Sequence, residues 1–336
     1  MFIGDMPELM EIILNNLNNE FYSLYSCALV SRHCKQCYKI SALNLYEFYS
    51  YYEPQFYHAF ICIIKSQEQL RQFSLSGEYV PTEFHGIISA LESQNNSLQE
   101  IIIEFCKLST EFKVLMNCKN LEILRIKHCD NLKILEASLN TLEVFNNLID
   151  ALDIVQILQK SGTLLQRLIL VSEYEPKIWE EPLLFETLKS FCPNITYLCI
   201  TVAGFSTQFL ELIINLQKLQ FLTLRSVELI QDIKVLTEMV VQFAKLLPLT
   251  LQYLDLCYSW MESFIDILLN NCYAPIKYLL IDWLYDDLKV KALTEFFIRK
   301  KSLNYICIRE NLDDNIKKEV EEYVTLMPYE RIVVNC

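Results

Sequence analysis

Few residues in this chain have the types and spacing that chemistry needs. Cys34 and Cys37 form its one Cys-x-x-Cys motif, with His33 directly before it. A tetrahedral zinc site takes four ligands, usually in two pairs, and no second pair stands nearby at a suitable spacing. On a helix these three side chains would point to different sides. The pattern favours ordinary packing, and we expect no metal site.

Catalytic motifs are also missing from the sequence. The histidines form no HxxxH pair, and no GxSxG elbow occurs. The five glycines are too scattered for a GxGxxG motif or a phosphate-binding loop. The acidic pairs Asp286-Asp287 and Asp313-Asp314 stand where helices are expected to begin, and carboxylates there stabilise the helix dipole. We therefore expect a non-enzymatic protein that binds no cofactor.

Charge and composition narrow the possible partners. The chain of 336 residues carries a net charge of −13, and 52% of its residues are hydrophobic. Such a surface repels phosphate backbones and anionic lipid headgroups, so we expect neither nucleic acid nor membrane as partner. The acidic start is unlike a signal peptide, and no apolar run approaches the ~20 residues that span a bilayer. A cytoplasmic or nuclear location is expected, where thiols stay reduced and most of the 13 cysteines serve as core residues.

A short sequence motif, here called the phrase, recurs from residue 70 onward, and its copies are expected to form most of the fold. It has apolar residues at its first, fourth and sixth positions, as in LEILRI, LQFLTL and LQYLDL. Clear copies start at residues 70, 98, 121, 165, 195, 219, 251, 276 and 303, and weaker ones at 132 and 142. Each phrase suits a short strand with alternate side chains turned inward. The segments between copies have helical spacing, so parallel strands with helical crossovers are expected.

This pattern resembles the leucine-rich-repeat family over residues 70–336. The resemblance implies an α/β solenoid with parallel strands on its concave face and helices on its convex face. The cysteine-containing subtype carries a Cys nine positions into the repeat, where Cys106 and Cys129 stand here. At such turns these side chains are expected to satisfy backbone groups. The strand at 331–335 is expected to close the sheet.

The repeats also offer a candidate binding surface. The third position of five successive late copies is aromatic, and these rings should form one column, because parallel strands lie ~4.8 Å apart. Beside the column, the seventh positions are Thr201, Arg225, Cys257, Asp282 and Arg309, and three of them are charged. The candidate substrate-binding residues are Tyr197, Phe221, Tyr253, Tyr278, Tyr305, Arg225, Asp282 and Arg309. Such a column can stabilise the sheet by stacking or bind a protein as a hot spot, and both interpretations stay open.

Residues 1–50 lack the repeat. MPELMEIILNNL and EFYSLYSCALVSRH each have the apolar spacing of a short helix, and residues 51–69 are expected to form a connecting helix. These two stretches resemble the F-box, whose second helix has the pattern LxSCALVSRxW, over about the first 34 residues. The chain departs from that pattern after Arg32, where His33 and Cys34 replace the usual Trp and no Pro–Leu–Trp run follows.

The F-box resemblance implies docking on the Skp-type adaptor of cullin–RING ubiquitin ligases. The residues expected to contact or support the adaptor are Pro7, Leu9, Ile13, Leu14, Leu17, Leu24, Cys27 and Val30. The chain would then be a substrate-recognition adaptor that presents an unknown protein substrate. The alternative is an interaction scaffold without a ligase link, in which residues 1–50 merely cap the first repeat.

Overall fold

The computed structural model describes residues 40–45, 54–77, 86–107, 110–129, 138–145, 151–172, 182–202, 206–226, 232–284, 286–310 and 312–328. The chain divides into two compact units, Met1–Leu164 and Leu165–Cys336. The residues expected to bind the Skp-type adaptor and the expected strand at 331–335 lie outside the described residues.

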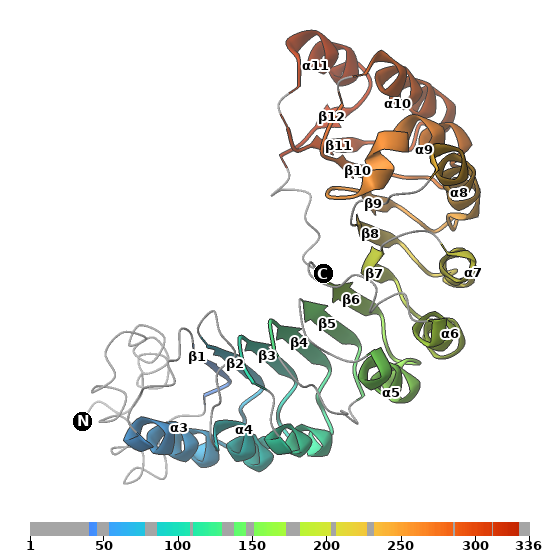
Figure 1. Ribbon diagram of the computed structural model, residues 1–336. Helices are drawn as coiled ribbons and strands as arrows, with labels where there is room; N and C mark the ends of the chain where they lie inside the picture. Colours follow the sequence, from blue (N-terminus) through green and yellow to red (C-terminus); the bar gives the residue numbers. More distant parts are fainter. Residues whose placement is uncertain are drawn as a thin grey trace. The chain divides into compact units, whose positions relative to one another are not determined.

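The described residues of the first unit form five parallel strands that pair in chain order (Figure 1). They are β1 (Ala42–Leu45), β2 (Gln72–Ser76), β3 (Glu100–Glu104), β4 (Ile123–Lys127) and β5 (Thr141–Phe145). The helical segments of this unit are α3 (Pro54–Ser66), α4 (Ile87–Ala90), η1 (Leu91–Gln94), η2 (Thr110–Asn117) and α5 (Ala151–Ser161). The helix expected within residues 51–69 is present as α3.

The second unit shows the same alternation, and the part of it that the structure describes has seven strands, again parallel and paired in chain order. They are β6 (Arg167–Val171), β7 (Tyr197–Val202), β8 (Phe221–Ser226), β9 (Tyr253–Asp255), β10 (Tyr278–Ile281), β11 (Tyr305–Ile308) and β12 (Thr325–Leu326). Its helices are α6 (Pro182–Phe191), α7 (Thr207–Asn215), α8 (Ile233–Leu246), η4 (Trp260–Phe264), α9 (Ile265–Asn271), α10 (Asp287–Lys300) and α11 (Asp314–Glu321). The predicted α/β architecture of strands joined by helical crossovers is confirmed.

Each strand begins two residues after the first apolar residue of its phrase. In the copy that starts at Ile276, the backbone N–H groups of Lys277 and Tyr278 both donate to the carbonyl of Gln252, at 2.7 and 3.0 Å. The same forked contact joins Arg71 and Gln72 to Ser41, at 2.8 and 3.0 Å. The first apolar residue therefore lies in the bend before the strand, where it is buried without joining the ladder.

Strands β1, β5 and β12 were not anticipated at their observed places. Strand β1 lies inside residues 1–50, which the sequence analysis treated as entirely helical, so the sheet begins before residue 70. Its sequence ISALNL does carry the phrase, and Ile40, Leu43 and Leu45 are all buried. Strand β5 belongs to a phrase that starts at Leu139 and not at residue 142, since Leu139 is buried in the bend and Leu142 lies in the strand.

The buried core is formed by the apolar positions that recur in each repeat. The fourth positions Leu198, Leu222, Leu254 and Leu279 are at most 1% exposed, as expected for residues turned from the strands toward the helices. A second line of packing joins consecutive helices, because the ring of Phe209 in α7 lies 5.9 Å from that of Phe185 in α6 and 6.3 Å from that of Phe243 in α8. Within the described residues, no helix is both long and apolar enough to cross a membrane.

The two repeat cysteines serve backbone groups, as expected. Cys106 is buried, and its thiol lies 3.1 Å from the carbonyl oxygen of Glu104, while its backbone N–H donates to the sulfur of Cys129 at 3.4 Å. The Cys129 thiol in turn lies 3.2 Å from the carbonyl oxygen of Lys127. Consecutive repeats of the first unit are thereby joined at the turn after each strand.

Candidate binding site

The five aromatic side chains at the third positions of phrases in the second unit form one continuous column. Ring centroids are 6.1 Å apart between Tyr197 and Phe221, and 5.9 Å apart between Phe221 and Tyr253. The column continues to Tyr278 at 6.4 Å and from there to Tyr305 at 5.2 Å. The predicted contact between neighbouring rings is confirmed.

Strand register creates this column. The five residues are direct partners across β7 to β11, and each is the first residue of its strand, so their side chains leave the sheet on the same face. Arg167 is the partner of Tyr197 on β6, and its guanidinium carbon lies 3.9 Å from the Tyr197 ring centroid. A cation therefore stacks on the first ring of the column.

The column is less exposed than the sequence suggested. Tyr253 in its centre is only 3% exposed, whereas the other four rings are partly buried. Tyr253 belongs to a buried cluster with Cys257, Leu280 and Cys307. Leu280 and Cys307 are the fifth residues of their phrases, and they lie on the same outward face of the sheet as the column. These apolar residues pack with the rings as a second small core on that face.

The charged residues beside the column form ion pairs across neighbouring strands. Arg225 lies 3.2 Å from the carboxylate of Asp255 and also donates to the carbonyl of Cys257. Arg309 lies 2.8 Å from the carboxylate of Asp282. The structure thus brings together all three predicted charged residues, Arg225, Asp282 and Arg309, with rings and acids from neighbouring strands.

Two members of this network escaped the sequence analysis, Asp255 and Tyr258. Tyr258 adopts a left-handed backbone conformation (φ 60°) and is 56% exposed, and its ring lies 4.0 Å from the guanidinium carbon of Arg309 and 5.2 Å from that of Arg225. Asp255 occupies a fifth position, one strand away from Arg225. An acid at the fifth position of one copy and an Arg at the seventh position of the preceding copy were the available signal.

Burial raises the pKa of the Asp255 carboxyl, and the neighbouring Arg225 guanidinium partly offsets that rise. The side chain is only 3% exposed, so its charge depends on the ion pair. Because the pKa is raised on folding, protonation of Asp255 favours the folded state, and this contribution is lost as the pH rises through the folded-state pKa.

We expect Arg225→Met to lower the free energy of unfolding by about 3 kcal/mol at pH 7, because it leaves a buried carboxylate without its cation. The loss should shrink as the pH falls toward the raised pKa of Asp255, where the carboxyl becomes neutral. Urea unfolding at pH 7 and pH 5 measures both effects, with Lys277→Met as the control at an exposed basic position. An equal loss at the two pH values would show that Arg225 acts through packing alone.

The arrangement of strands and helices decides the fold class. The chain has a leucine-rich-repeat fold. In each unit the LxxLxL phrases form parallel strands, and the first, fourth and sixth residues of each phrase enter the core.

Comparisons with known proteins add solved structures of low similarity. The leucine-rich-repeat protein LegL7 from Legionella pneumophila has 13% identity and a TM-score of 0.48, over 86% of this chain and 91% of that one. A chain from the complex of Rad7 and Elc1 in yeast has 14% identity and a TM-score of 0.41, over 98% of this chain and 94% of that one. No family model matches the chain, and no curated protein matches it in sequence.

Proposed function

We propose that the chain is a substrate-recognition adaptor of a cullin–RING ubiquitin ligase. Residues 1–34 dock on the Skp-type adaptor, and the repeats hold a protein substrate for ubiquitination. In this role the chain supplies binding surfaces, and other ligase subunits supply the transfer chemistry.

The structural observation that supports substrate binding is the aromatic column of β7 to β11. Aromatic side chains are enriched among the residues that dominate protein interfaces, because they bury a large area at a small cost in side-chain entropy. Four of the five rings keep part of their surface accessible, and two arginines lie beside them, held in place by ion pairs. A rigid face of rings flanked by charges suits a protein partner better than a small substrate.

The support for adaptor docking is the sequence SCALVSR and the apolar stripe before it. A specific feature favours the alternative, a scaffold whose first residues are a cap. Strand β1 begins at Ala42, which leaves only the stretch between Arg32 and Ala42 for the third helical segment of an F-box. Co-expression of the full chain with a Skp-type adaptor and a cullin separates the two functions: the proposal expects a stable ternary complex, and the alternative expects the chain to purify alone.

Substrate capture gives a second test. We expect Tyr278→Ala to weaken binding of the cellular target by about 2 kcal/mol, roughly thirtyfold, because a partly exposed ring in mid-column would be lost from the contact. Tyr253→Ala should act mainly through stability, since that ring is buried. Gln72→Ala on β2 is the control, and it should cost almost nothing. Target recovery from cells, together with the melting temperature of each variant, measures these effects.

Full target recovery by Tyr278→Ala with a lowered melting temperature would contradict the binding role. The column would then be structural, because stacked neighbours on a sheet contribute up to about 1 kcal/mol of stability on their own.

A further inference from the structure

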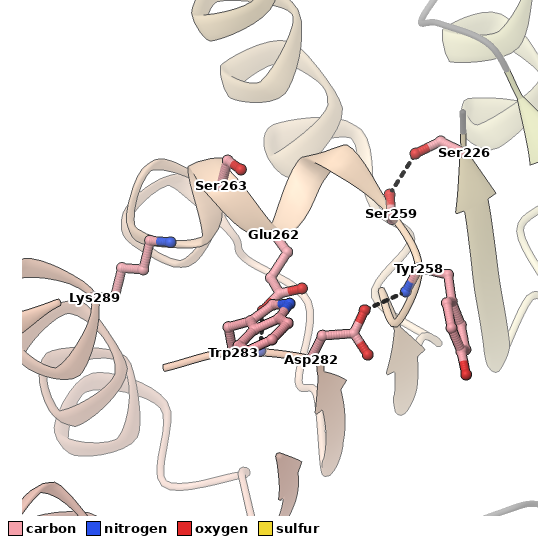
Figure 2. A pocket seen from close by; sticks show the side chains of 8 residues that line it. All are labelled: Ser226, Tyr258, Ser259, Glu262, Ser263, Asp282, Trp283 and Lys289. Carbon is pink, nitrogen blue, oxygen red and sulfur yellow. Dashed lines mark hydrogen bonds between the residues drawn. The ribbon is translucent and has the colours of Figure 1, made fainter. Parts of the chain in front are cut away.

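A polar pocket opens in the second unit, where the chain leaves strands β8 to β10. Its volume is about 460 Å³. Figure 2 shows the side chains that line it, which are Ser226, Tyr258, Ser259, Glu262, Ser263, Asp282, Trp283 and Lys289. They come from the end of β8, the turn after β9, η4, the turn after β10 and α10.

Glu262 is held rigidly in this pocket. Its side chain extends from η4 toward Trp283 and Asp282, and its Oε1 atom accepts a hydrogen bond from the backbone N–H of Trp283. The residue is only 6% exposed. The segment that carries it is fixed at its start, where the hydroxyl groups of Ser226 and Ser259 lie 3.0 Å apart and Ser226 Oγ accepts from the backbone N–H of Trp260 at 2.9 Å.

The two acids of the pocket differ in how their charge is balanced. Asp282 lies 2.8 Å from the guanidinium of Arg309 and accepts from the backbone N–H of Tyr258 at 2.5 Å. Glu262 has no ion pair in the part of the chain that the structure describes. Among the described residues that line the pocket, Lys289 is the one base against the two acids Glu262 and Asp282.

The pKa of the Glu262 carboxyl reflects its burial and this charge imbalance. Burial raises the pKa of its carboxyl to about 7, the backbone N–H of Trp283 opposes that rise, the negative charge of Asp282 adds to it, and Lys289 lowers the pKa only as the weakest influence. A buried carboxylate with too little positive charge around it gains stability when a cation arrives.

Aromatic surface stands beside the carboxyl. Trp283 is 41% exposed and Tyr258 is 56% exposed, both large for aromatic residues. One of these rings already carries a guanidinium, since Arg309, which does not line the pocket, lies over Tyr258. A carboxylate and an accessible indole together favour a planar cation, because guanidinium groups pair with carboxylates through two hydrogen bonds and also stack on aromatic faces.

We propose that this pocket binds an arginine side chain of the protein substrate, with Glu262 as counter-ion and Trp283 as the ring on which the guanidinium packs. This inference rests on the proposed function in one respect, since it takes the ligand to be part of a protein. The substrate then carries a basic residue next to the segment that contacts the aromatic column.

The test uses the full chain and a small probe. Nα-acetyl-arginine methylamide is titrated while the indole N–H signal of Trp283 is followed by NMR, with Trp283→Phe to assign that signal. The neutral isostere Nα-acetyl-citrulline methylamide is the matched control. We expect a saturable shift with the arginine probe and none with citrulline. Binding should be roughly tenfold tighter at pH 8 than at pH 6, because a carboxyl with a pKa near 7 is mostly protonated at pH 6.

Glu262→Gln should remove both the response and its pH dependence, whereas Glu295→Gln, an exposed acid on α10, should leave both unchanged. Unchanged melting of each variant shows that folding is not the cause. Equal responses to arginine and citrulline, or no response to either, would overturn the proposal. A response to inorganic phosphate alone would make the pocket an anion site. The probe involves neither the Skp-type adaptor nor the column, so its failure leaves the proposed function standing and is distinguishable from the failure of that function.

Discussion

Leu14→Asp and Val30→Asp are each expected to abolish binding to the Skp-type adaptor. Both residues belong to the apolar positions of the F-box-like segment. A carboxylate forced into an apolar contact loses its hydration without gaining a partner, which costs several kcal/mol and more than a hundredfold in affinity. A pull-down with the purified adaptor measures the loss.

Asn16→Asp is the matched control, because it adds the same charge at a polar position between the apolar ones. It should bind as the wild type does. The circular dichroism and melting of the repeats should stay unchanged in all three variants. If Leu14→Asp and Val30→Asp still recover the adaptor, these helices do not form the contact that the F-box resemblance implies.

Leu279→Ala is expected to lower the free energy of unfolding by about 2–5 kcal/mol, because it leaves a cavity in a site that cannot collapse. Leu279 is 1% exposed and pairs with Leu254 and Ile306 on the flanking strands, so three repeats lose packing together. Urea denaturation of the full chain measures the change.

Leu288→Ala provides the comparison at an exposed leucine. Leu288 is 67% exposed at the start of α10, and its truncation should change the unfolding free energy by less than about 0.5 kcal/mol. Similar losses for the two variants would contradict the assignment of fourth positions to the core.

The fold could largely be predicted from the sequence, because each LxxLxL phrase marks the position of one strand. The LxxLxL phrase sets which residues turn inward, and its recurrence sets the parallel order. Strand β1 was missed although ISALNL fits the phrase, because the stretch lay next to residues that resemble an F-box and was assigned with them. The strands start two residues after the start of each phrase, because the first apolar residue packs in the bend and only the following residues find partners in the ladder.

The candidate site was predictable only in part. The column follows directly from a strand register that repeats itself, so Tyr197 and its partners could be placed together from spacing alone. The burial of Tyr253 could not, because it depends on Leu280 and Cys307, which reach the same face from other repeats. Glu262 lies between phrases, in η4, and only the fold brings it beside Trp283.

A calorimetric titration of the purified wild-type chain with a purified Skp-type adaptor tests whether this chain is a substrate-binding partner of that adaptor. We expect saturable binding of one adaptor per chain, at a dissociation constant below roughly ten micromolar, or about 7 kcal/mol of binding free energy. Absence of binding heat at tens of micromolar would contradict it, and the chain would then be a leucine-rich-repeat scaffold whose first residues cap the sheet.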